Sequence, residues 1–146
     1  MKVFKIDGEP VAQARARLGR GGFVYDPNCR DKMIIQTLLN QNRTWEKFVN
    51  PRISFMFVMP IPKSTNPRLA ERYRRGMIKH CKKPDIDNLV KLYLDCMDGI
   101  IFEGDQNVSL GECIKVYGTD PATLIYIQST NEEVSIHEIN NLSLAV

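Results

Sequence analysis

The residues with the clearest potential for chemistry lie between Lys83 and Asp95, where carboxylates and a lysine interrupt an apolar pattern. Asp85 and Asp87 are two positions apart, a spacing that puts side chains on the same side of an extended segment. Two carboxylates where a chain enters a helix offer oxygen ligands to a hard divalent cation. Lys91, one turn later, would reach a phosphate bound to that cation. The pattern indicates metal-assisted chemistry on a phosphate ester.

The same residues also have an ordinary structural interpretation. Asp87 would be the N-cap of a helix, and Asp95 would be a solvated residue that pairs with Lys91. Asp85 argues against this alternative because capping does not require a second carboxylate. The strongly basic segment that precedes Asp85 argues against it as well.

Positive charge is concentrated in the segment 63–83, where eight lysines and arginines face Glu71 alone and the net charge is +7. The whole chain carries only +3, and the segment from 119 onward carries −4. A basic segment beside carboxylates suits a polyanion such as nucleic acid. The candidate DNA contacts are Arg15, Arg17, Arg68, Arg72, Arg74, Arg75, Lys79, Lys82 and Lys83. The alternative is a solvated helix or flexible loop, which would leave the DNA surface to Arg15, Arg17 and Arg20.

Length and composition bound the class of protein. A chain of 146 residues that is 43% hydrophobic predicts one domain, residues 1–146, with a real core. No run approaches the roughly 18 apolar residues that a membrane span requires, and the N-terminus does not resemble a signal peptide. The four cysteines lack CxxC spacing, so we expect reduced thiols in a cytoplasmic protein without zinc. Of the two histidines, His80 is expected to be solvated.

Hydrophobic periodicity predicts the elements that must position these residues. Strands are expected at 3–6, 53–59, 100–102, 108–117 and 122–128, and the segment 134–139 is ambiguous. Helices are expected to begin at Asn66–Pro67, to span 30–49, and to span Asp87 to a stop at Gly99. The segment 8–26 reads as irregular. Strands that follow one another directly favour an α+β domain with a mixed or antiparallel sheet and helices packed on it.

Each predicted helix has a face expected to be buried. The helix at 30–49 would carry its apolar side chains at Met33, Ile34, Leu38, Trp45 and Phe48. The helix that follows Asp85 would bury Ile86, Leu89, Val90, Tyr93, Leu94 and Met97.

Two stretches of the chain resemble the RusA family of Holliday junction resolvases. The sequence from Lys83 to Ile101 is similar to the family signature K-P-D-x-D-N-L-x-K-x-x-L-D-x-L-x-G, which precedes a turn carrying D-D-x-Q-V. The segment from Gly8 to Arg17 is similar to the family opening G-x-P-x-x-x-x-R-x-R. The central motif is specific, whereas the opening alone would be weak.

The resemblance implies a small homodimeric, Mg²⁺-dependent endonuclease, with Mn²⁺ as a possible substitute, that nicks four-way DNA junctions symmetrically in recombination and repair. Family members are common in prophages. By position in the motifs, Asp85 and Asp87 would be catalytic metal ligands, Lys91 the catalytic lysine and Asp105 the third catalytic ligand. The turn departs from the family pattern, because Gly104 replaces an aspartate and the sequence Gln106–Asn107 replaces the x-Q order.

Two other functions compete with this interpretation. A DNA-binding module or branched-DNA binder without cleavage activity would keep the basic segment and use the aspartates only as caps. A metal-dependent enzyme acting on small phosphoesters would keep the aspartates. The eight cations of the segment 63–83 count against that second rival, since one phosphate does not need so many.

Overall fold

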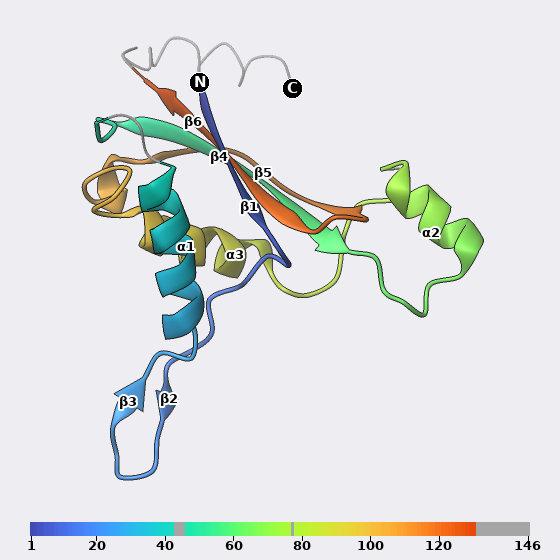
Figure 1. Cartoon of the computed structure of the whole chain (residues 1–146), viewed down its shortest axis with the longest axis horizontal. Helices are drawn as coiled ribbons and strands as arrows, with labels where there is room; N and C mark the ends of the chain where they lie inside the picture. The colour runs from blue at the N-terminus through green and yellow to red at the C-terminus, as the bar shows by residue number, and fades with distance from the viewer. Residues whose placement is uncertain (43–45, 77, 131–146) are drawn as a thin grey trace, which may run out of the picture.

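The computed structural model describes residues 1–42, 46–76 and 78–130. The described residues form a mixed sheet with two helices packed on one face (Figure 1). The four strands, in their order across the sheet, are β1 (Lys2–Asp7), β6 (Ala122–Ser129), β4 (Pro51–Pro60) and β5 (Ser109–Gly118). The pairs β1–β6 and β6–β4 are antiparallel, whereas β4 and β5 are parallel. This architecture agrees with the predicted α+β class.

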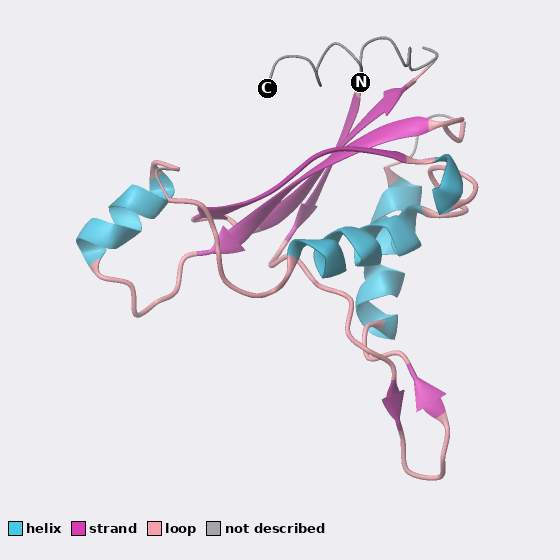
Figure 2. Ribbon diagram, turned by 180° about the vertical axis from the view of Figure 1, so that it is seen from behind, coloured by secondary structure: helices cyan, strands magenta, loops and turns pink. Residues whose placement is uncertain are grey.

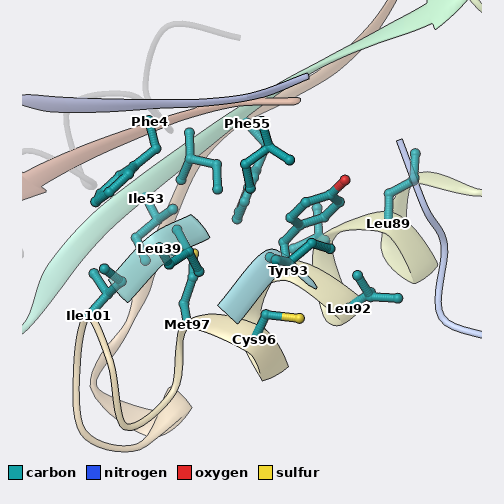
Figure 3. Close-up of a cluster of buried hydrophobic side chains, with 14 of the residues drawn as sticks. Phe4, Leu39, Ile53, Phe55, Leu89, Leu92, Tyr93, Cys96, Met97 and Ile101 are labelled. Carbon is teal, nitrogen blue, oxygen red and sulfur yellow. The ribbon is translucent and has the colours of Figure 1, made fainter. Parts of the chain in front are cut away.

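The packed helices are α1 (Cys29–Gln41) and α3 (Ile86–Met97). Alternate residues of the central strand β4, including Ile53, Phe55 and Phe57, point toward these helices and are almost fully buried. α3 contributes its own buried stripe to this core, in which Tyr93 lies against the aromatic rings of β4 (Figure 3). The hydroxyl of Thr123 donates a hydrogen bond of 2.8 Å to the phenolic oxygen of Tyr93, so this buried polar group is satisfied. α3 is therefore held rigidly against the sheet.

Two elements stand away from this core. α2 (Pro67–Arg74) lies beyond one end of the sheet, and the hairpin of β2 (Arg17–Leu18) and β3 (Val24–Tyr25) projects from the body (Figures 1 and 2). Neither the hairpin strands nor the 3-10 turn η1 (Asp105–Asn107) contributes a buried residue. None of the helices in the described ranges has the length and apolarity to cross a membrane.

Several predicted elements are confirmed. Strands at 3–6, 53–59, 108–117 and 122–128 are present as β1, β4, β5 and β6. α2 begins as expected, with Pro67 in its first turn and the Asn66 side chain accepting a hydrogen bond of 2.9 Å from the amide of Arg68. The buried face of α3 is confirmed in part: four of the six predicted residues are buried, whereas Ile86 and Leu94 are half-buried and the unpredicted Leu92 and Cys96 are buried instead. Gly99 follows the helix with a φ of +75° that favours glycine.

Four predictions about the elements are wrong. The segment 8–26 is not irregular throughout, because its residues 17–18 and 24–25 pair as the antiparallel hairpin of β2 and β3. The helix predicted at 30–49 ends at Gln41, and Phe48 instead forms a parallel bridge with Phe102. Met33 and Ile34 are exposed because α1 turns Ile35 and Leu39 inward. The predicted strand at 100–102 is a turn, since the amides of residues 100 and 101 bond back to the carbonyl of Met97.

The predictions for Trp45 and for the segment 134–139 concern residues outside the described ranges.

Candidate metal and nucleic-acid site

The start of α3 places the two aspartates of the central motif. Asp85 occupies the N-cap position in an extended conformation, with φ −71° and ψ 144°, but its carboxylate forms no capping hydrogen bond. Asp87 lies in the first helical turn, where the positive end of the helix dipole favours a negative charge. The interpretation of Asp87 as the N-cap is therefore wrong. Neither carboxylate accepts a capping hydrogen bond from the amides of the helix N-terminus.

Both aspartates and Lys91 are exposed. Within the described ranges, none of these three side chains forms an ion pair or a side-chain hydrogen bond. Other carboxylates do find partners: Asp95 lies 3.5 Å from the ammonium group of Lys32. The motif thus presents two acceptor-only groups and one cation, all open to a ligand.

A cavity of about 840 Å³ opens beside Asp85 and Asp87. Three of the lysines predicted to contact DNA line it together with the aspartates, and so do further charged groups from the edge strand β5. Its ionisable lining residues are Lys79, His80, Cys81, Lys82, Lys83, Asp85, Asp87, Glu112 and Lys115. The structure therefore brings the carboxylates and one part of the basic segment into a single hollow, where an anionic ligand would meet both.

Lys115 ties this part of the basic segment to the sheet. From the middle of β5, its ammonium group donates hydrogen bonds of 2.7 Å to the carbonyl oxygens of Lys82 and Pro84. The amide of His80 in turn donates to the carbonyl of Lys115 at 3.4 Å. The chain that leads into Asp85 is therefore fixed at two carbonyls, one of them immediately before the aspartate.

The sequence did not single out Lys115 as a site residue. The available signal was a single lysine in an otherwise apolar part of a predicted strand, between Ile114 and Val116. Lysines are seldom placed in half-buried positions without a partner. The partners here are backbone carbonyls more than thirty residues earlier in the chain, which no local pattern reveals.

His80 is buried, contrary to the expectation that it is solvated. Its ring lies 4.6 Å from that of Tyr117, which stacks in turn on Tyr73 of α2 at 4.0 Å between centroids. The ring atom Nδ1 is buried without a hydrogen-bond partner in the described structure. Burial, with the positive charges of Lys115 and Lys82 nearby, lowers the pKa of His80 from its ordinary value of 6.5. His80 thus packs against Tyr117 of β5, on which α2 also rests through Tyr73.

Asp105 lies at the opposite end of α3 from Asp85. The turn that carries it follows the helix C-terminus, and the amide of Gly104 donates a hydrogen bond of 2.8 Å to the carboxylate of Asp98. A helix of 12 residues is about 18 Å long. In the described part of the chain, no three acidic, histidine or cysteine side chains come close enough to hold a metal ion. Within a single chain, Asp105 therefore does not lie close enough to Asp85 and Asp87 to share a metal ion with them.

The remaining predicted DNA contacts occupy two separate elements. Arg68, Arg72 and Arg74 belong to α2, and Arg75 directly follows it. Glu71 pairs with Arg74 at 3.2 Å and with Arg75 at 2.9 Å. Arg15 and Arg17 are exposed at the projecting hairpin.

Comparison with known proteins identifies the family. The family model "Endodeoxyribonuclease RusA" matches residues 7–128, which include both motifs and extend from the end of β1 into β6. The chain is also 29% identical over 136 residues to an uncharacterized protein, YqaN, of Bacillus subtilis (strain 168), a match that covers 88% of this chain and 96% of that protein. No solved structure matches the chain significantly. The extent of the family match shows that the chain belongs to the RusA family of endodeoxyribonucleases.

Proposed function

We propose that this protein is a divalent-metal-dependent endonuclease that resolves four-way DNA junctions by paired, symmetrical nicks. The observation that carries the proposal is the cavity beside α3, where Asp85 and Asp87 lie without protein partners among the lysines of the basic segment. Membership of the RusA family supports the same reaction class.

The two aspartates fit a magnesium site. Mg²⁺ is commonly held by one or two carboxylates together with waters and substrate phosphate oxygens, so a pair of exposed carboxylates is a sufficient protein contribution. When bound, the ion would supply an activated water and would stabilise charge on the scissile phosphate. Asp85 and Asp87 would hold it, and Mn²⁺ would be expected to replace it.

Lys91 would act on the phosphate directly. It lies one turn beyond Asp87 on the same exposed side of α3 and has no carboxylate partner in the described ranges. Negative charge that develops on the phosphate oxygens in the transition state would be stabilised by an ammonium group held nearby. Lysines 79, 82 and 83 would neutralise neighbouring phosphates in the same cavity.

A homodimer would reconcile the position of Asp105 with a role as the third ligand. Four-way junctions present two equivalent strands, so a twofold dimer would offer one site to each. If the twofold axis of such a dimer passes between the two α3 helices, the helices run in opposite directions. The C-terminal end of one α3 would then lie near the N-terminal end of the other. Asp105 would then complete the site of the second copy rather than its own.

The experiment that tests the proposal compares three substrates: a mobile four-way junction, a linear duplex and a nucleotide phosphoester, each with and without Mg²⁺. Binding and cleavage are measured separately. Paired nicks confined to the junction and dependent on the metal are expected. Tight binding without cleavage would instead identify a DNA-binding module, and hydrolysis of the phosphoester would identify a small-substrate enzyme.

A further inference from the structure

The hairpin formed by residues 15–25 has the composition of a nucleic-acid contact rather than of a structural element. It carries Arg15, Arg17 and Arg20 and no acidic residue. Four large apolar side chains are exposed on it: Leu18 is 75% exposed, Phe23 61%, Val24 68% and Tyr25 42%. Exposed apolar side chains gathered in one place mark an interaction site.

The base of the hairpin is fastened beside the candidate metal site. The amide of Gln13 donates a hydrogen bond of 2.8 Å to the carbonyl of Asn88, the residue that follows Asp87. The amide of Ala14 donates to the side chain of Asn28 at 2.6 Å, which joins the two arms where they leave the body. The segment that leads into the hairpin is thus bonded to the start of α3, and the hairpin itself projects from the body beyond the start of α1 (Figures 1 and 2).

Its tip is shaped to present one aromatic ring. Gly21 and Gly22 form the turn at the tip with φ values of +93° and +82°, a backbone conformation that favours glycine. Phe23 folds back over Gly19, where an added Cβ would lie only 2.6 Å from the ring, and the two residues share a backbone hydrogen bond of 2.8 Å. The ring of Tyr25 lies 6.2 Å from that of Phe23.

From these features we infer that the hairpin is a wedge that recognises the branch point of the DNA junction, where base pairs are exposed at the crossover. Phe23 and Leu18 would pack on the exposed bases, and the arginines would contact the phosphates around them. Aromatic side chains stack on any base, and apolar wedges separate base steps. This inference rests on the proposed function and gives its selectivity for junctions a structural origin.

The side chains favour a branch point over an intact groove. A two-stranded ribbon does fit the major groove of DNA, but base edges are read there mainly by hydrogen-bonding side chains. Residues 17–25 include no Asn, Gln, Ser or Thr. Arginine alone would read base edges, and the four apolar side chains would be left against the polar groove walls.

The test measures affinity for a four-way junction and for a linear duplex of the same arm sequence, without a divalent metal. Phe23→Ala should weaken junction binding about 5- to 150-fold, the range that corresponds to about 1–3 kcal/mol for one stacked base. Duplex binding should stay within about twofold. Val49→Ala is the matched control, because Val49 is 77% exposed and lies outside the hairpin. This variant should bind both DNAs like the wild type.

Phe23→Trp keeps the experiment informative if the alanine variant disturbs the hairpin. This variant should retain junction preference, and its added fluorescence should be quenched by the junction and not by the duplex. Equal loss of affinity for both DNAs, no loss for either, or a change in oligomeric state would overturn the inference. If the wild-type protein itself shows no preference for junctions, the proposed function fails first, and the wedge fails with it.

Discussion

Asp85 and Asp87 lie among cations without forming an ion pair to any described residue, which is unusual for carboxylates near several lysines. The geometry of Lys115 helps to explain this. Its ammonium group is turned to the carbonyls of Lys82 and Pro84, so it supports the backbone before Asp85 and does not neutralise the carboxylate. At the residue scale, a half-buried cation that lines the same cavity is bonded to backbone carbonyls, and the two carboxylates remain open to a ligand.

Removal of this support should weaken metal binding. Lys115→Met leaves two carbonyls without their donor and frees the segment before Asp85, so the Mg²⁺ concentration for half-maximal nicking should rise about tenfold or more. Mn²⁺ binding, followed by electron paramagnetic resonance of the free ion, should weaken in parallel. Lys5→Met removes the same charge from the opposite edge strand β1 and should change neither quantity. An unaltered metal requirement in Lys115→Met would show that the contact serves stability alone.

His80 should make the protein sensitive to acid. Because burial lowers its pKa in the folded state, the unfolded chain binds more protons below the ordinary value of 6.5. This contribution to the free energy of unfolding is therefore retained above pH 6.5 and is lost as the pH falls below it. Chemical denaturation between pH 7.5 and 5 should show a decline that is shallower in His80→Phe. Equal declines in the two proteins would assign the acid sensitivity to other groups.

At the scale of elements, α3 was the most predictable part of the molecule because its apolar spacing and its terminal Gly99 are both local signals. The end of α1 was not predictable, since the sequence of residues 30–49 is compatible with one long helix until tertiary contacts are known. Phe48 leaves that pattern to pair with Phe102, a contact between distant parts of the chain.

The candidate site was likewise predictable only where the signals are local in the sequence. Motif positions located Asp85, Asp87 and Lys91, but no pattern in the sequence reveals that α3 separates Asp105 from them or that Lys115 reaches two carbonyls.

α2 is the second element expected to touch DNA. Its polar surface carries Arg68, Arg72, Arg74 and Arg75, and a stack of Tyr73 on Tyr117 attaches it to the sheet. If these arginines contact phosphates, Arg72→Ala combined with Arg75→Ala should make the log–log salt dependence of junction binding shallower by about one to two units. The single-turnover rate at saturating DNA should stay unchanged, because the carboxylates lie on α3.

The control for that measurement neutralises two lysines elsewhere, Lys2→Ala with Lys5→Ala on β1. Its salt dependence should match the wild type. If the α2 variant leaves the salt dependence of junction binding unchanged, α2 is a solvated helix. The phosphate contacts would then fall to the cavity lysines and the hairpin.

At the scale of the whole molecule, the account requires two copies of the chain. If Asp105 acts in the site of its partner, Asp85→Asn and Asp105→Asn should each be inactive as homodimers. A mixed dimer of the two variants should regain one intact site, because one copy supplies Asp85 and the other supplies Asp105 to that site. The readout is nicking of a single junction strand by coexpressed variants. No recovery in a mixed dimer would place Asp105 in its own chain's site, whereas nicking by the Asp105→Asn homodimer would place Asp105 outside catalysis.

The central claim, that the carboxylates at the start of α3 perform metal-dependent cleavage, is tested most directly by junction nicking in Asp85→Asn. Asp120→Asn is the matched control, since Asp120 is exposed and lies far along the chain from the motif. The account predicts paired nicks by the wild type and the control in Mg²⁺, none by Asp85→Asn, and junction affinity in Asp85→Asn equal to or tighter than wild type because a negative charge near phosphate is removed. Cleavage by Asp85→Asn within a few-fold of the wild-type rate would contradict it.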